Sequence, residues 1–135
     1  EFDPEGITDA RKRVSSSIAR RQGQPAFRKR LMTNYAGRCA ISGCDVKPVL
    51  EAAHILPYLG PKTNHPSNGL LLRADLHTLF DLRLITVDPE TKTVLIDPKL
   101  IGTLYEQFKG NPIRDSLGQP PSFKALKRHR KESKL

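Results

Sequence analysis

Two histidines, an amide and a carboxylate follow one another at short intervals in the middle of the chain. His54 is followed by Asn68 after fourteen residues, by His77 after nine more and by Asp81 after another four. Side chains four residues apart on a helix point the same way, so His77 and Asp81 can hold one cation between them. A histidine has an ordinary pKa of about 6.5, so His54 can accept a proton at cellular pH. The stretch Leu50–Leu84 is therefore predicted to hold one chemical site.

Local signals predict which elements position these residues. A short apolar segment ends on His54 and is typical of a strand, whereas the next thirteen residues contain three prolines and a glycine and predict an irregular loop. A second apolar run follows the turn pair Asn68-Gly69, and Asp75 is a suitable N-cap for a helix. The predicted order is strand Leu50–His54, loop Ile55–Ser67, strand Leu70–Leu72 and a helix through His77 and Asp81.

Four sequence motifs surround these residues: GRCAISG at Gly37–Gly43, EAAHI at Glu51–Ile55, NGLLLRADLH at Asn68–His77 and LFD at Leu79–Asp81. Together with the order His54, Asn68, His77 they resemble the HNH family of nucleases. The resemblance covers roughly Gln22–Leu100 well and the C-terminal third more loosely. It implies a ββα-metal finger, and the motifs are similar to a subgroup often fused to DNA-recognition domains in restriction enzymes.

The resemblance implies a role for each residue in the hydrolysis of a phosphodiester, which needs an activated water and a cation that neutralises developing charge. His54 matches the general base. Asn68 either orients the loop after His54 through hydrogen bonds or touches the metal, and His77 and Asp81 match metal ligands. We expect His54, Asn68 and His77 to be catalytic. The nitrogen and oxygen ligands suit Mg²⁺ or Mn²⁺ best, with Ni²⁺ or Zn²⁺ as alternatives.

One position departs from the family pattern. Many members have an acidic residue or histidine directly before the base, where this chain has Ala53. Glu51 lies on the same side of the predicted strand, but its carboxylate is expected to be far from the metal. We therefore expect two or three protein ligands, with water and phosphate completing the coordination of the cation.

The remaining histidines and the cysteines are expected to have minor roles. His65 lies in the proline-rich loop and His129 in a basic tail, where both are expected to contact solvent or phosphate. Cys39 and Cys44 are the only cysteines. A structural zinc normally takes four Cys or His ligands, so we interpret both as reduced, partly buried thiols in a strand and a turn.

The net charge of +9 is concentrated at the two ends of the chain. Residues 1–38 have a net charge of +5 and residues 109–135 of +6, whereas the central residues 39–108 have a net charge of −2. This distribution favours binding of a polyanion by basic residues on either side of the site. The predicted DNA-binding residues are Arg28, Lys29, Arg30, Lys127, Arg128 and Arg130.

The sequence as a whole predicts an α+β fold in which helices surround a small sheet. We divide it into a basic N-terminal helix or linker, residues 1–23, and an HNH nuclease domain, residues 24–135, with the finger at about 49–84. The other predicted helices are Ile7–Gln22, Gln24–Ala36 with Phe27, Leu31 and Tyr35 facing the core, Pro98–Lys109 and Phe123–Lys131. The other predicted strands are Arg38–Ile41 and a hairpin of Leu84–Val87 with Val94–Ile96, and Asn111–Ser122 is predicted to be a loop.

The leading hypothesis is a divalent-metal-dependent DNA endonuclease, the nuclease domain of a restriction enzyme that could depend on base modification. The alternative is a catalytically degenerate DNA-binding module that keeps the finger as a scaffold, since Ala53 removes a ligand. A homing or toxin role is also open, whereas an RNA-binding domain has little support because aromatic residues are few.

Expected partners are DNA and a fused or separate DNA-recognition domain, and two-strand cleavage would suit a homodimer. The chain begins at Glu1-Phe2 without an initiating Met, so we expect a longer parent protein. No apolar run has the length of a membrane span or a signal-peptide core, so a soluble cytoplasmic protein without a membrane partner is expected.

Overall fold

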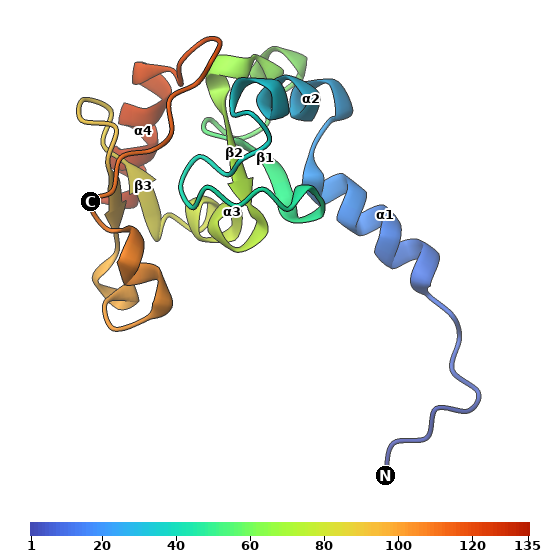
Figure 1. Ribbon diagram of the computed structural model, residues 1–135. Helices are drawn as coiled ribbons and strands as arrows, with labels where there is room; N and C mark the ends of the chain where they lie inside the picture. The colour runs from blue at the N-terminus through green and yellow to red at the C-terminus, as the bar shows by residue number, and fades with distance from the viewer.

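Four α-helices and two small antiparallel sheets make up the computed structural model, which describes residues 1–135 (Figure 1). This arrangement confirms the predicted α+β class. One buried apolar cluster of 23 residues joins all of these elements except the first helix. In chain order the elements are α1 (Arg11–Gln22), α2 (Pro25–Asn34), β1 (Leu50–His54), β2 (Gly69–Arg73), α3 (Ala74–Asp81), β3 (Ile85–Val87), β4 (Val94–Ile96) and α4 (Phe123–Ser133).

The predicted strand, loop, strand and helix are present as β1, the loop 55–68, β2 and α3. β1 and β2 pair antiparallel, with Leu50 opposite Arg73 and His54 opposite Gly69. Both strands are buried along nearly their whole length, because α2 and α3 pack against them. The sheet therefore fixes the position of His54 at the end of β1 and the position at which α3 begins.

Helix α2 forms where the sequence predicted it. Pro25 occupies its first turn, and the side chain of Gln24 caps it by accepting a hydrogen bond from the Phe27 backbone N–H at 2.7 Å. Phe27, Leu31 and Tyr35 are all buried, as their spacing predicted. These side chains pack α2 against the β1–β2 sheet.

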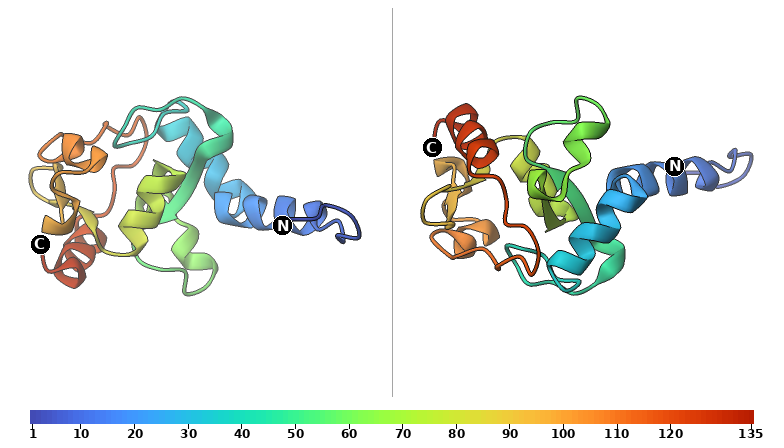
Figure 2. Two further views of the ribbon diagram at one scale, coloured as in Figure 1. Left: turned by 90° about the horizontal axis from the view of Figure 1, so that it is seen from below. Right: turned by 90° about the horizontal axis from the view of Figure 1, so that it is seen from above.

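Helix α1 begins at Arg11, four residues later than predicted, and none of its residues is buried. Figure 2 shows it extending away from the rest of the molecule, and Figure 1 shows the N-terminal segment continuing beyond its far end. Its C-terminal turn leads into Gly23, whose φ of 108° only glycine adopts readily. A Cβ at Gly23 would lie 2.9 Å from that of Ala52, so the chain passes directly over β1.

The C-terminal part of the chain covers the side of α3 away from α1. The predicted hairpin is present as β3 and β4, and α4 packs on β3 (Figure 1). Ser122 caps α4 by accepting a hydrogen bond from the Ala125 backbone N–H at 3.1 Å. α4 continues to Ser133, two residues beyond its predicted end.

The predicted strand Arg38–Ile41 is wrong, because this segment is a tight turn. The backbone N–H of Cys39 donates to the carbonyl of Cys44, and that of Gly43 donates back to the carbonyl of Cys39. Cys39, Ala40 and Ile41 are nevertheless buried. The apolar residues of this segment therefore reflect its burial and not an extended backbone.

The predicted helix Pro98–Lys109 is also wrong. Gly102 has a φ of 84°, and the Thr103 hydroxyl accepts a hydrogen bond from the Tyr105 N–H, so a new turn starts there. The segment forms two short 3₁₀ helices, Pro98–Leu100 and Leu104–Phe108.

No helix in the molecule combines the length and apolar character needed to cross a membrane.

Asp75 is not the N-cap of α3, since α3 starts at Ala74 and Arg73 occupies the cap position. The Asp75 carboxylate accepts hydrogen bonds from the Arg73 guanidinium at 2.7 and 3.0 Å and from the Tyr105 hydroxyl at 2.9 Å. The bonds from Arg73 are the main reason that the pKa of Asp75 lies below its usual value. An acidic residue in the first helical turn still favours the helix through its dipole.

Candidate active site

A cleft of about 830 Å³ opens between the C-terminal end of α1, the end of β1 and helix α3. Three of the four predicted site residues, His54, His77 and Asp81, line it. The chain therefore brings together residues that the sequence places up to 27 positions apart. The other lining residues are Ser17, Arg20, Arg21, Gly23, Gln24, Ala52, Pro57, Tyr58, Asn64 and Arg83.

His54 lies at the end of β1 between an aromatic ring and an amide. Its ring stacks on Phe27, with centroids 4.6 Å apart and planes 12° from parallel, and Tyr58 lies tilted at 5.8 Å. Nε2 lies 2.7 Å from the Asn64 carbonyl oxygen Oδ1. Since that oxygen can only accept, Nε2 carries the proton and Nδ1 is the basic nitrogen of the neutral ring. Asn64 thus fixes the tautomer of His54.

Gly69, opposite His54 in the sheet, makes room for this stack. A Cβ at Gly69 would lie 2.6 Å from Phe27 Cζ and 2.7 Å from Leu31 Cδ1, too close for either atom. The backbone of Gly69 is an ordinary extended one, with φ of −141°. Its small size rather than its flexibility is therefore what the site needs.

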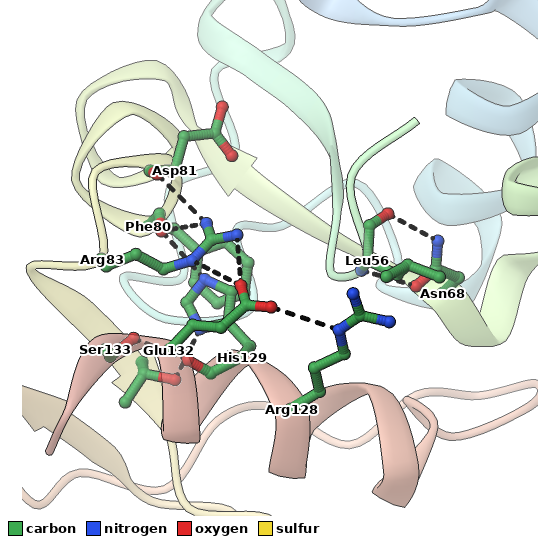
Figure 3. Close-up of polar contacts among 10 residues, drawn as sticks. Leu56, Asn68, Phe80, Asp81, Arg83, Arg128, His129, Glu132 and Ser133 are labelled. Atoms are coloured by element: carbon green, nitrogen blue, oxygen red, sulfur yellow. Dashed lines mark hydrogen bonds and ion pairs between the residues drawn. The ribbon is translucent and has the colours of Figure 1, made fainter. Parts of the chain in front are cut away.

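Asn68 is buried and faces the loop rather than the cleft. Its Oδ1 accepts a hydrogen bond from the Leu56 N–H at 2.8 Å, and its Nδ2 donates to the carbonyls of Leu56 at 3.0 Å and Thr63 at 2.9 Å. Figure 3 shows the paired bonds with Leu56. Of the two roles that the resemblance left open, these contacts correspond to orienting the loop, which carries Tyr58 and Asn64 to His54.

His77 lies between two carboxylates. Its Nδ1 is 2.7 Å from Glu51 Oε1, and its Nε2 is 3.3 Å from Asp81 Oδ2. Burial is the main reason that the pKa of His77 lies below its ordinary value, so the ring is neutral at neutral pH. Nδ1–H therefore donates to Glu51, and the Nε2 lone pair faces Asp81. Glu51 was expected to lie too far away to bind the metal, and here it bonds to the ring nitrogen of His77 that faces away from Asp81, so it orients His77.

This arrangement fits the predicted cation with two direct ligands. Nε2 of neutral His77 and Oδ2 of Asp81 are both electron-pair donors, and they converge at 3.3 Å. A carboxylate bonded to the other ring nitrogen, as Glu51 is here, commonly orients a metal-binding histidine. Ala53 is fully buried, and nowhere do three or more His, Cys, Asp or Glu side chains gather as metal ligands. The remaining coordination positions would fall to water and phosphate.

Arg21 is a site residue that sequence reasoning missed. Its Nη1 is 3.0 Å from Asp81 Oδ2, its Nε is 3.3 Å from Glu51 Oε1, and its Nη2 donates to Thr78 Oγ1 at 3.3 Å. The sequence shows a basic helix but not which of its basic residues faces the site. Asn64 was also missed, because the sequence of the irregular loop after His54 does not show which of its side chains reaches the imidazole.

His129 is not in a solvated tail, so its predicted contact with solvent or phosphate is wrong. Its ring is 1% exposed and stacks on Phe80, with centroids 3.7 Å apart. Nε2–H donates to the Phe80 carbonyl at 2.9 Å, and the Thr86 hydroxyl lies 2.7 Å from Nδ1. Burial is the main cause that lowers the pKa of His129 to about 4. The periodic burial of Leu126, His129 and Ser133 makes α4 a core helix.

Arg83 links α4 to the end of α3, as Figure 3 shows. Its guanidinium donates to the carbonyls of Phe80 at 3.4 Å and Asp81 at 3.1 Å, and to Glu132 Oε2 at 3.0 Å. Glu132 also accepts a hydrogen bond from Arg128 at 3.2 Å. The carbonyls at the C-terminal end of α3 therefore have partners outside the helix.

The six predicted DNA-binding residues occupy different surroundings. Arg28 donates to the backbone carbonyls of Leu50 at 3.3 Å and Lys47 at 2.9 Å, and Arg130 pairs with Asp88 at 2.9 Å. Lys29 and Arg30 line a second hollow together with His65, whose Nδ1 accepts a hydrogen bond from the Ser67 N–H. Lys127 and Arg128 lie on the exposed face of α4. Their contact with DNA remains a prediction.

The cysteines are free. Cys39 is fully buried and its sulfur accepts hydrogen bonds from the backbone N–H groups of Ser42 and Arg73, both at 3.3 Å. Cys44 is partly buried and packs against the core. Both are placed to support the turn behind β2.

Comparison with known proteins agrees with this geometry. Residues 39–88, which contain His54, Asn68, His77 and Asp81, match the HNH endonuclease family model. The chain carries an HNH endonuclease domain. Comparison with curated proteins found no match.

A solved structure similar to this HNH domain is described as a modification dependent TagI restriction endonuclease. The two chains are 26% identical and superpose with a TM-score of 0.57, over 77% of this chain. The match covers 36% of the other chain, so this chain spans little more than a third of that protein's length. The likeness supports the fold of the HNH domain well beyond the family match.

Proposed function

We propose that this chain hydrolyses phosphodiester bonds of DNA, with His54 as general base and a divalent cation held by His77 and Asp81. The observation that carries the proposal is that these three side chains line one cleft within an HNH endonuclease domain. Mg²⁺ or Mn²⁺ suits the donors best. Where bound, the cation would neutralise charge that develops on the phosphate and on the leaving oxygen.

The chain's own residues would do the rest. Asn64 keeps the proton of His54 on Nε2, which leaves Nδ1 to accept a proton from the attacking water. Asn68 holds the loop that carries Asn64, and Phe27 keeps the ring in one plane. Glu51 keeps the proton of His77 on Nδ1 and leaves Nε2 free as a ligand.

The wider context is also a proposal. The likeness to a modification dependent restriction endonuclease supports restriction of DNA, and this chain's span of about a third of that protein suits a nuclease domain that works with a DNA-recognition domain. The backbone of DNA is a polyanion, which suits the net charge of +9. Cleavage of both strands needs two sites, for which a homodimer is the simplest arrangement.

The alternative is a DNA-binding module that has lost catalysis. It is favoured by the buried Ala53, which removes a ligand, and by Arg21, which already neutralises Asp81. Such a module would bind DNA with strong salt dependence and leave it intact.

Conversion of supercoiled plasmid to nicked and linear forms separates the two functions. The assay uses modified and unmodified DNA with Mg²⁺, Mn²⁺, Ni²⁺ or EDTA. We expect metal-dependent cleavage that falls about 10²–10⁴-fold in His54→Ala, the usual contribution of a general base. His65→Asn is the matched control, because His65 is an exposed histidine outside the cleft and asparagine can still accept from Ser67. Intact plasmid under every condition would favour the binding module.

A further inference from the structure

We infer that Arg21 is a positioning residue that occupies the cation position of the site until a divalent cation displaces it. The inference rests on the proposed metal role of Asp81 and His77. Arg21 Nη1 lies 3.0 Å from Asp81 Oδ2, the same oxygen that lies 3.3 Å from His77 Nε2. A ligand oxygen of the proposed cation is therefore already paired with a guanidinium.

The charges at the site explain why the two cations exclude each other. Glu51 and Asp81 supply two negative charges, and Arg21 is the only arginine or lysine within ion-pairing distance of them. A divalent ion alone balances both carboxylates, whereas a divalent ion beside Arg21 leaves an excess positive charge in a partly buried place. Like charges at a few ångströms repel strongly where water is scarce. Binding of a metal therefore requires the guanidinium to leave Asp81.

The attachment of α1 makes this exchange mechanically easy. No residue of α1 is buried, so the helix has no apolar anchor in the core. Apart from Arg21, its last turn is held by one hydrogen bond, from Gln22 Nε2 to the Pro48 carbonyl at 3.0 Å. The side chain of Arg21 is 41% exposed and can turn outward without opening the core. Displacement of Arg21 thus loosens α1 without unfolding the domain.

Thermodynamic linkage makes the coupling reciprocal. If a bound metal weakens the contact between Arg21 and Asp81 by some factor, that contact must lower the affinity for the metal by the same factor. Arg21 sets the metal affinity of the site and metal sets the order of α1. A coupling of the usual size corresponds to a factor of about 5–150 in affinity.

Direct binding of Mn²⁺ to the whole chain tests the inference, with free Mn²⁺ measured by electron paramagnetic resonance. Arg21→Gln removes the competing charge and should bind Mn²⁺ at least fivefold more tightly. Arg20→Gln is the matched control, because Arg20 is the neighbouring residue, lines the same cleft and pairs with neither carboxylate. It should change the affinity less than twofold. A merely structural role for Arg21 predicts weaker binding, not tighter.

Amide hydrogen exchange gives a second readout. Mn²⁺ should accelerate exchange in residues 11–22 of the wild-type chain, and Arg21→Gln should show that faster exchange without metal. An unchanged or weaker Mn²⁺ affinity in Arg21→Gln, or an equal gain in Arg20→Gln, would overturn the inference.

Asp81→Asn separates this failure from failure of the proposed function. Asp81→Asn could lose Mn²⁺ binding while Arg21→Gln binds Mn²⁺ with the affinity of the wild type. That result would support the metal site and contradict the role of Arg21. If Asp81→Asn binds Mn²⁺ as well as the wild type, or if no variant binds it, both the metal site and the inference fall.

Discussion

Replacement of Gly69 by alanine tests whether the packing of Phe27 sets the orientation of the His54 ring. The new Cβ would lie 2.6 Å from Phe27 Cζ, 2.7 Å from Leu31 Cδ1 and 2.9 Å from Phe27 Cε1. Three contacts this short cannot persist, so the Phe27 ring must shift. His54 stacks on that ring, so the base moves with it.

The magnitude follows from the cost of overpacking. An extra methyl group in a filled core destabilises a protein by about 1–3 kcal/mol. For a chain of this size, about 2 kcal/mol lowers the Tm by roughly 8 °C. Backbone strain adds nothing, because the φ of −141° at Gly69 suits alanine. Urea denaturation and a thermal scan measure the loss, and cleavage of plasmid at 25 °C measures the activity of the folded fraction.

A compensating change separates the two effects. Phe27→Leu removes two of the three atoms that meet the new Cβ, so Gly69→Ala should cost less in a Phe27→Leu background than in the wild type. Activity should stay low in both, because the surface on which His54 stacks is disturbed. Wild-type stability and wild-type activity in Gly69→Ala would refute the reasoning that Phe27 fixes the ring.

Other predictions concern pH, the loop and the basic residues. The pKa of His129 is about 4 in the folded chain and about 6.5 when unfolded, so the unfolded state binds more protons between these values. The contribution of neutral His129 to the free energy of unfolding should be fully present above about pH 6.5. The free energy of unfolding should fall by about 2 kcal/mol from pH 7 to pH 5. Urea denaturation at both pH values should show a smaller fall in His129→Gln. Asn68→Ala breaks three hydrogen bonds to the loop and should cost about 3 kcal/mol in urea denaturation, whereas a loss below about 1 kcal/mol would contradict a tethering role. Arg28→Gln should lower stability by about 1–2 kcal/mol through its lost carbonyl contacts. The double change of Lys29 and Arg30 to Gln should instead reduce the salt slope of DNA binding by about 2, and an unchanged slope would remove both from the interface.

The finger was predictable because its signals are local. The apolar segment before His54, the prolines of the loop and the turn pair Asn68-Gly69 each specify nearby backbone. The i, i+4 spacing of His77 and Asp81 needs only a helix, and α3 supplies it. Helix α2 was predictable for the same reason, from its apolar period and its proline.

The errors arise where a distant segment decides the structure. Cys39 and Ala40 look like part of a strand but form a turn whose backbone bonds reach Leu71 and Arg114. His129 looks like part of a basic tail because its partners, Phe80 and Thr86, lie 49 and 43 residues earlier. No local pattern shows that a basic helix buries a histidine.

The proximity of the candidate residues His54, His77 and Asp81 was predictable, but the contacts that surround them were not. The types and spacing of His54, His77 and Asp81 were enough to place them in one cleft. The contacts of Glu51 and Arg21 with these residues depend on how β1, α1 and α3 meet. Side-chain direction at such a junction is set by packing, which a single sequence does not show.

The carbonyl of Phe80 has a consequence for the order in which the domain matures during synthesis. The eight residues of α3 are too few for a stable helix in isolation, and Phe80 O accepts from His129, which is made 49 residues later. A ribosome adds about 5–20 residues each second, so several seconds separate the two. The proposed metal ligands on α3 are therefore translated before the contact from α4 that completes the packing of their helix. The domain would gain a competent site late in its own synthesis.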